Sequence, residues 1–493
     1  MGLVVTYFSV WNKAKGKLDM CVKCLRGWWV VPVLVLSSLG AAGRTVPLVD
    51  AVKGGSVDDV RALLQEHDVN TPEADGTTAL HWAVHRNDVA VAGLLIRAGA
   101  DVTAVNRYGV TPLLLAAENG SAAMAGRLLE AGAEANATVG TNETALMTAA
   151  RTGDVDTVRV LLTYGAEVQA RENWLGQTAL MWAAAENNPD ASKVLIAAGA
   201  DVQARSAAGF TPLLFSAQLG HIEAAGVLLA AGADVDAPLP DGMSPLVVAV
   251  ANGNYDFAAW LLEQGANPNA AEHGWTALHH LSWVRRPNVG QSKVPGPVTT
   301  GTVSSLDLIV RLIDHGADPD ARQQQEPRDG YRNLLDRKGA TPFLLAAKAA
   351  DVEMMRVLFE NGADPLSRTD DQTTPLMVAA GVGIYSPGEN PGTNEEALEA
   401  VKLAAELGGN VRAVSDYGYT ALHGAAHRGA PEIVQFLADN GAKLDAKLTK
   451  SGGGRSGWTE GWTALAIADG QFYGNTFKRS PETATLLRDL LSE

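Results

Sequence analysis

Cysteine is almost absent from this sequence of 493 residues. The chain has only two cysteines, Cys21 and Cys24, and both precede residue 44. Residues 44–493 therefore offer no disulfide, no catalytic thiolate and no cysteine ligand for a metal. The C-x-x-C spacing of the two cysteines is typical of redox and zinc sites. They lie just before an apolar run, however, and we interpret their spacing as accidental.

The motifs of several common catalytic sites are also missing. The sequence has no G-x-S-x-G elbow and no C-x-x-C-H haem attachment. Two histidine pairs, His81 with His85 and His423 with His427, have a spacing of one helical turn, which can hold zinc. Neither pair has a third ligand near it in the sequence. We therefore predict no catalytic residue, no metal site and no cofactor.

Positive charge is in short supply. The chain has 39 basic and 55 acidic residues, a net charge of −16. The first 43 residues carry five basic side chains and one acidic side chain, so the remaining chain carries −20. This surplus argues against nucleic acid or an anionic membrane surface as a partner and permits a basic protein partner. An apolar content of 46% indicates a folded core rather than disorder.

What the sequence does have is an internal repeat. Thr-Ala-Leu or Thr-Pro-Leu recurs with a spacing of 32 to 34 residues, starting at Thr78, Thr111, Thr144, Thr178, Thr211, Ser244 and Thr276. After wider gaps the cluster returns at Thr341, Thr374, Thr420 and Thr463. A second cluster, Gly-Ala-Asp/Glu/Asn, keeps the same phase from Gly99 to Gly265. A period in this range predicts a solenoid of stacked supersecondary units.

Residues 75–107 show how one unit is built. Asp75 opens a turn, and Thr78 caps a first helix that Asn87 ends. A second helix follows over 89–97, and Gly99 supplies the left-handed residue that closes it. Each unit exposes an apolar face that only a neighbouring unit can cover, so stability comes mostly from nearest-neighbour contacts.

This pattern resembles the ankyrin repeat, D-G-x-T-P-L-H-x-A-A-x-x-G…LL…G-A-D-x-N. Thr420-Ala421-Leu422-His423 and Gly265-Ala266-Asn267-Pro268-Asn269 match it closely, and the resemblance covers about nine tenths of the chain. It implies an all-α, elongated and curved solenoid of about twelve helix–turn–helix units. It also implies a non-enzymatic scaffold that binds proteins, although the targets of such scaffolds are unrelated to one another.

We expect one repeat domain over residues 44–493. It has an N-terminal cap (47–74), regular repeats (75–273), an insert-bearing repeat (274–337), further repeats (338–460) and a C-terminal cap (461–493). Inserts rich in proline, glycine and serine are expected as loops at 284–305, 322–337, 383–394 and 447–459. They are either functional or the result of drift at tolerant sites. Arg285, Arg286 and Lys293 form a small basic spot in the first of these inserts.

Residues 1–43 read as a leader. Lys23 and Arg26 precede the apolar run Trp28–Leu39, and small residues follow it, which is the order of a secretory signal peptide. Cleavage near Gly43 would release a periplasmic or secreted protein, which we expect to be bacterial. An uncleaved membrane anchor is the alternative, and Met20 competes with Met1 as the true start.

The predicted partner-binding surface is the concave face with its turn tips. Aromatic and arginine side chains, which commonly anchor protein interfaces, recur at these positions. The candidates are Arg107, Tyr108, Arg151, Trp174, Phe210, Met243, Trp275, Tyr417, Tyr419, His427, Arg428 and Trp462. Packing of tip aromatics on neighbouring tips is the alternative to binding. Two rival functions stay open: an enzyme with the insert of residues 284–305 as a lid, and a structural spacer at the cell envelope.

Overall fold

The computed structural model describes residues 46–286, 298–299, 301–326, 334–385, 392–450, 459–473 and 476–493. These residues form 24 helices and two short hairpins. The all-α repeat fold predicted from the sequence is confirmed. The chain divides between Pro240 and Asp241 into an N-terminal unit (residues 46–240) and a C-terminal unit (residues 241–493), which we describe separately.

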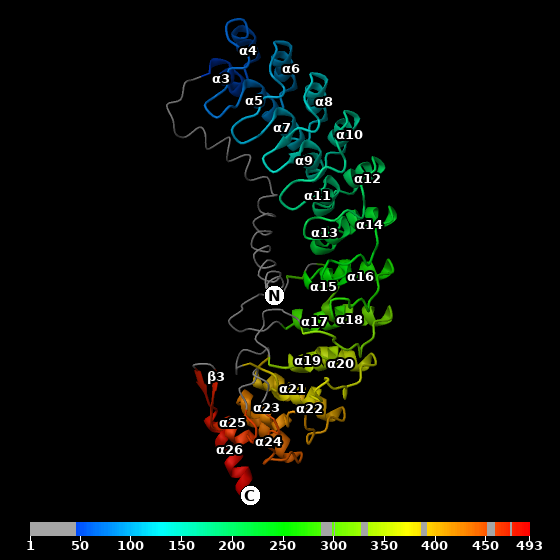
Figure 1. The fold of residues 1–493 in the computed structure, drawn as a ribbon, viewed down its shortest axis with the longest axis vertical. Helices are drawn as coiled ribbons and strands as arrows, with labels where there is room; N and C mark the ends of the chain where they lie inside the picture. Colours follow the sequence, from blue (N-terminus) through cyan, green and yellow to red (C-terminus); the bar gives the residue numbers. More distant parts are fainter. Residues whose placement is uncertain are drawn as a thin grey trace. The chain divides into compact units, whose positions relative to one another are not determined.

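The N-terminal unit consists of six helix pairs. The first helices are α3 (Pro47–Gly54), α5 (Ala79–His85), α7 (Pro112–Glu118), α9 (Ala145–Thr152), α11 (Ala179–Ala185) and α13 (Pro212–Leu219). The second helices are α4 (Val57–Leu63), α6 (Val89–Arg97), α8 (Ala122–Glu130), α10 (Val155–Thr163), α12 (Pro189–Ala197) and α14 (Ile222–Ala230). Strands β1 (Thr138–Val139) and β2 (Glu143–Thr144) pair antiparallel in one turn tip. First helices pack on first helices and second on second, giving two parallel rows (Figure 1).

The C-terminal unit repeats this arrangement with longer connections. Its first helices are α15 (Pro245–Ala251), α17 (Ala277–Val284), α19 (Pro342–Lys348), α21 (Pro375–Ala380), α23 (Ala421–Arg428) and α25 (Ala464–Asp469). Its second helices are α16 (Tyr255–Glu263), α18 (Ser305–Asp314), α20 (Val352–Glu360), α22 (Asn394–Glu406), α24 (Pro431–Asp439) and α26 (Pro481–Ser492). Strands β3 (Gln471–Tyr473) and β4 (Thr476–Lys478) form a hairpin between α25 and α26 that the sequence analysis did not predict.

Local sequence explains where the helices begin and end. The Thr111 hydroxyl oxygen accepts a hydrogen bond from the Leu114 amide at 3.2 Å, and Pro112 occupies the first helical position, where its missing N–H has no cost. Asn87, at φ 52°, turns the chain from α5 to α6, and Gly99, at φ 89°, follows the end of α6. The predicted bounds of this helix pair are therefore confirmed.

Adjacent repeats share a buried core and a set of side-chain hydrogen bonds. Leu80 and Leu95 are at most 1% exposed, because the neighbouring helix pair covers them. The Asn70 side-chain amide donates to the carbonyl oxygen of Gly99 at 3.1 Å, and Asn136 does the same to Gly165 at 3.0 Å. The recurring glycine thus serves two purposes: it closes its own helix and accepts a bond from the preceding repeat.

Parts of the sequence analysis fall outside the described residues. These parts are the leader (residues 1–43) and most of the insert at 284–305, together with portions of the other three inserts. Helix α17 ends at Val284 and α18 begins at Ser305, which agrees with the predicted limits of the first insert. No helix within the described ranges is both long and apolar enough to cross a membrane.

Candidate functional site

The turn tips and first helices, which we call the tip face, carry the residues predicted to bind a partner. Arg107, Tyr108 and Trp174 are exposed there. A further seven candidates are half-buried: Arg151, Phe210, Met243, Trp275, Tyr417, Tyr419 and Trp462. His427 and Arg428 are buried, at 4% and 7% exposure, which corrects their expected place on an open surface.

Consecutive turn tips are joined by single backbone hydrogen bonds. The Arg107 amide donates to the Asp75 carbonyl oxygen at 2.8 Å, and the Ala207 amide to the Leu175 carbonyl oxygen at 2.7 Å. The C-terminal unit has equivalent bonds, for example from Thr449 to Tyr417 at 3.1 Å. These bonds fix the spacing of the tips, so side chains on the tips are presented from a rigid frame.

Trp174 is the most exposed aromatic side chain of the tip face in the N-terminal unit, at 56%. Its turn is organised by Glu172, which is itself only 6% exposed. The Glu172 carboxylate accepts hydrogen bonds from the backbone amides of Trp174, Leu175 and Gln177 at 2.6 to 2.9 Å. The turn is therefore held by internal bonds that leave the indole ring free.

Tyr108 is 41% exposed, and Arg107 covers its ring at 4.7 Å. The Arg107 guanidinium also donates to the Tyr108 hydroxyl. The two predicted residues thus form one stacked cation–π unit.

Two tryptophans on the first helices were missed by the sequence analysis. The Trp82 indole N–H donates to Glu73 at 2.7 Å, and Lys53 lies 4.4 Å from the ring. Arg151, which is ion-paired with Glu118, lies 5.9 Å from the Trp182 ring. Both tryptophans follow their capping threonine by four positions. An alignment of the repeats would therefore have shown that they occupy the same position on their first helices.

An aromatic cluster on α17 and its turn surrounds Trp275 in the C-terminal unit. The Trp275 ring lies 4.4 Å from His273 and 5.4 Å from Trp283, and Trp283 lies 5.3 Å from His280. Burial lowers the pKa of His273 to about 4 and that of His280 to about 3, so both rings are neutral at pH 7. Trp275 therefore packs on its own repeat.

Three other aromatic candidates, Phe210, Tyr417 and Tyr419, also contact a ring of their own repeat. Phe210 lies 5.2 Å from Phe215, and Tyr417 stacks on Tyr419 at 5.7 Å. Phe210 also packs against Met181 and Ala204 of the preceding repeat, whereas Trp174 has no ring contact within the described residues.

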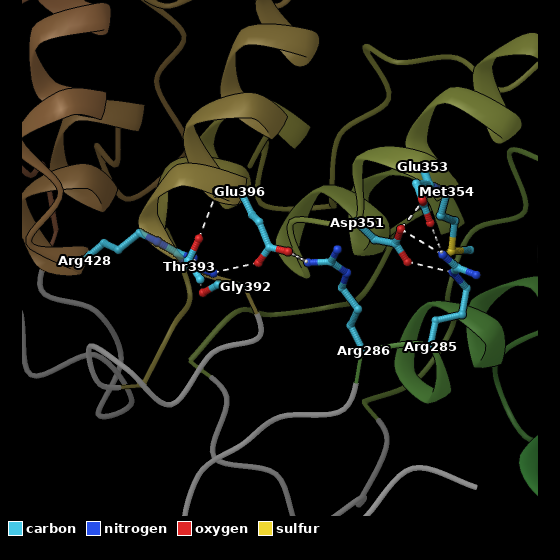
Figure 2. A network of polar contacts seen from close by, with 9 residues as sticks. All are labelled: Arg285, Arg286, Asp351, Glu353, Met354, Gly392, Thr393, Glu396 and Arg428. Atoms are coloured by element: carbon cyan, nitrogen blue, oxygen red, sulfur yellow. Dashed lines mark hydrogen bonds and ion pairs between the residues drawn. The ribbon is translucent and has the colours of Figure 1, made fainter. Parts of the chain in front are cut away.

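The basic spot predicted at Arg285 and Arg286 is neutralised by ion pairs (Figure 2). Arg285 bonds Asp351 at 2.7 and 3.1 Å and reaches Glu353 at 3.3 Å. Arg286 pairs with Glu396 at 3.1 Å. These pairs tie the end of α17 to the starts of α20 and α22, so both arginines of the predicted basic spot are paired with carboxylates. Lys293 lies outside the described residues.

The predicted structural role of the threonine-linked histidines is supported by their geometry. The Thr78 amide donates to His81 Nδ1 at 3.2 Å, and Nε2 lies 3.1 Å from the Val110 carbonyl oxygen in the next repeat. Burial lowers the pKa of His81, so the neutral ring with a proton on Nε2 is favoured. No group of three or more potential metal ligands occurs in the described parts of the chain.

Comparison with protein-family models decides the family. The model "Ankyrin repeats (3 copies)" matches residues 48–139, 127–206, 146–239, 185–272 and 213–289, and the model "Ankyrin repeat" matches 338–370 and 417–447. The chain belongs to the ankyrin-repeat family. Ankyrin repeats generally mediate protein–protein interactions and are typically non-enzymatic.

Individual relatives of this ankyrin-repeat chain share only part of it. The neurogenic locus notch homolog protein 2 of human and that of mouse are each 32% identical to it over 149 residues. The match covers 30% of this chain and 5% of the length of those relatives. The crystal structure of the human ASB11 ankyrin repeat domain is similar over 45% of this chain and all of that domain, at 27% identity and a TM-score of 0.42.

Proposed function

We propose that this ankyrin-repeat protein is a non-enzymatic scaffold that recognises a protein partner through its tip face. The observation that carries the proposal is Trp174, exposed at the tip of a turn that Glu172 holds from within. Leaving a tryptophan in water gains nothing for folding, whereas a preorganised, exposed aromatic ring is a common interface anchor. The Arg107–Tyr108 stack supplies a second anchor of the same kind on another tip of the N-terminal unit.

A capture experiment with a matched control tests this proposal. The chain from residue 44 is immobilised and exposed to an envelope fraction of the native host, and captured proteins are quantified by mass spectrometry. The test variant is Trp174→Ala with Tyr108→Ala. The control is Tyr164→Ala, since Tyr164 is 44% exposed but lies at the end of a second helix, away from the tip face.

We expect a specific set of proteins to be captured by the wild type and by the Tyr164 variant and to be lost from the double variant. Equal capture by all three proteins would contradict binding through the tip face. Unchanged far-ultraviolet circular dichroism of the double variant confirms that it is folded.

We further propose that the protein is exported, to a bacterial periplasm or beyond the cell. The support is the order of charged, apolar and small residues before Arg44. N-terminal sequencing of the protein purified from its native host should give a start near Arg44. Retention of Met1 or Met20 on a membrane-bound protein would favour the anchor, and their retention on a cytosolic protein would contradict export.

A further inference from the structure

Arg428, at the end of α23, is a buried cation without a carboxylate partner. Its side chain is enclosed by the protein, with 7% of the residue exposed. One guanidinium nitrogen donates to the Gly392 carbonyl oxygen at 3.4 Å, and Nε is buried with no hydrogen-bond partner. Within the described residues no carboxylate lies at ion-pair distance from it. Burial lowers the pKa of Arg428 to about 10, against the opposing charge of Glu396.

Glu396 is the carboxylate whose field acts on Arg428, but both of its oxygens are engaged elsewhere (Figure 2). One oxygen pairs with Arg286 at 3.1 Å. The other accepts the backbone amide of Thr393 at 2.8 Å, as part of the capping box of α22. Glu396 therefore lies near Arg428 without pairing with it, and Glu395, the other acidic residue in the first turn of α22, is exposed.

The amino end of α22 adds positive potential at the same place. Helix α22 is 13 residues long, and Thr393 is its N-cap. The amino end of such a helix carries a partial positive charge and favours anions. Gly392, whose carbonyl oxygen accepts from Arg428, and Thr393 are exposed, so the amino end of α22 is open to solvent.

Arg285 is a buried arginine of the same protein whose charge is balanced by carboxylates. Burial acts to lower its pKa, but hydrogen bonds and charge from Asp351 and Glu353 outweigh burial and raise it. The contrast matters because an unpaired buried charge is costly. Groups with strongly perturbed pKa values cluster at functional sites.

We propose that Arg428 and the amino end of α22 bind a carboxylate. Within the described residues no carboxylate contacts Arg428, so a carboxylate ligand would supply the missing partner. The planar guanidinium, with Nε–H unpaired, matches the two oxygens of a carboxylate. The group is carried either by an acidic residue or chain end of a protein or by a small organic acid. The inference does not depend on partner binding through Trp174 and Tyr108.

Nuclear magnetic resonance of the arginine Nε–H groups in the full chain tests the site. Sodium acetate is titrated against sodium chloride at equal ionic strength, with sodium phosphate in a parallel series. The Arg428 signal, assigned by its loss in Arg428→Lys, should shift saturably with acetate. Arg285 is an internal control, since its Nε already donates to Asp351 at 2.7 Å and its signal should not respond.

Two variants separate binding from a structural role. Arg428→Met should lose the acetate-dependent rise in Tm, while its Tm without acetate stays equal to the wild type or increases, because the uncompensated charge is gone. Arg337→Met is the matched control: Arg337 is equally buried but paired with Glu326 at 3.3 Å, and its loss should lower Tm.

Three results would overturn the proposal. The first is an Arg428 signal that acetate does not move. The second is a fall in Tm for Arg428→Met as large as that for Arg337→Met, which would make Arg428 structural. The third is saturation by phosphate at lower concentration than by acetate, which would assign the site to phosphoryl groups. A peptide ending in a free carboxylate, compared with its amidated form, then distinguishes a protein source from a small acid.

Discussion

The Nε2 atom of His279 lies 3.1 Å from the carbonyl oxygen of Ala340, 61 residues further along the chain. His81 makes the same bond to Val110, at the same distance but across only 29 residues. The extra residues of the insert-bearing repeat therefore leave the contact between α17 and α19 in its ordinary geometry. Long loops have this freedom because the entropy of closing them grows only logarithmically with length.

Replacement of His279 by leucine should lower stability by about 2 kcal/mol. The substitution leaves the Ala340 carbonyl and the Thr276 amide, which donates to Nδ1 at 3.2 Å, without partners in a buried place. Urea unfolding followed by tryptophan fluorescence measures the change. His85→Ala, at a half-buried histidine on a first helix, is the control and should have little effect. Similar midpoints for the two variants would contradict the role given to the cross-repeat bond.

Stability should fall as pH decreases from 6.5 to 4. The pKa values of His279, His423 and His427 are lowered to about 4, mainly by burial. The unfolded chain therefore binds more protons than the folded chain in this window, and its stability is lost on acidification. For His279 alone the loss is on the order of 3 kcal/mol once the pH is below 4.

The C-terminal unit contains these three histidines. On acidification its backbone amides should lose protection from hydrogen exchange before those of the N-terminal unit. Hydrogen exchange resolved by peptide at pH 7, 5.5 and 4.5 measures this order. Earlier loss in the N-terminal unit would show that other groups dominate acid unfolding.

Replacement of Arg285 by alanine should be strongly destabilising. Asp351 has a side chain that is 0% exposed, and without Arg285 its charge would remain buried and unpaired, at a cost of about 3 to 5 kcal/mol. The adjacent Arg286 supplies the control, because its partner Glu396 is 40% exposed and the loss of such a pair costs about 1 kcal/mol or less. Thermal melts of both variants measure the difference. Equal melting temperatures would mean that the Asp351 carboxylate finds another partner.

Trp174 and Trp275 should respond differently to truncation. Trp174→Ala should leave Tm nearly unchanged and weaken partner binding, since the ring is 56% exposed. Trp275→Ala should lower stability by about 2 kcal/mol, because the ring packs on His273 and Trp283. The double variant should combine the two effects. Loss of stability in Trp174→Ala would show that this ring packs within the fold.

The repeat architecture could be predicted from the sequence because its causes are local. The Thr78 hydroxyl oxygen caps a helix by accepting a hydrogen bond from the His81 amide, and Gly99 follows the end of the next helix at φ 89°. A spacing near 33 residues then fixes which helices stack. The hairpin of β3 and β4 could not be predicted in this way, because it interrupts the last repeat only and has no counterpart to align with.

The candidate site was less predictable than the repeats. The exposure of each candidate side chain depends on contacts with the inserts, and the repeat period does not specify these contacts. His427 and Arg428 occupy positions that are open in a regular repeat. Here His427 Nε2 lies 3.2 Å from the Ile384 carbonyl oxygen, and Arg428 reaches Gly392. Both partners belong to the insert before α22.

The sequence by itself therefore determined the helix pairs, their caps and their stacking order, since these follow from short-range hydrogen bonding and hydrophobic periodicity. Only the tertiary structure decided which charges are paired. Arg285 meets Asp351 across 66 residues, whereas Arg428 meets no carboxylate within the described residues. The inserts differ in length, and the way each one rejoins the stack of repeats decides which charged residues meet. The repeat period gives no information about these connections.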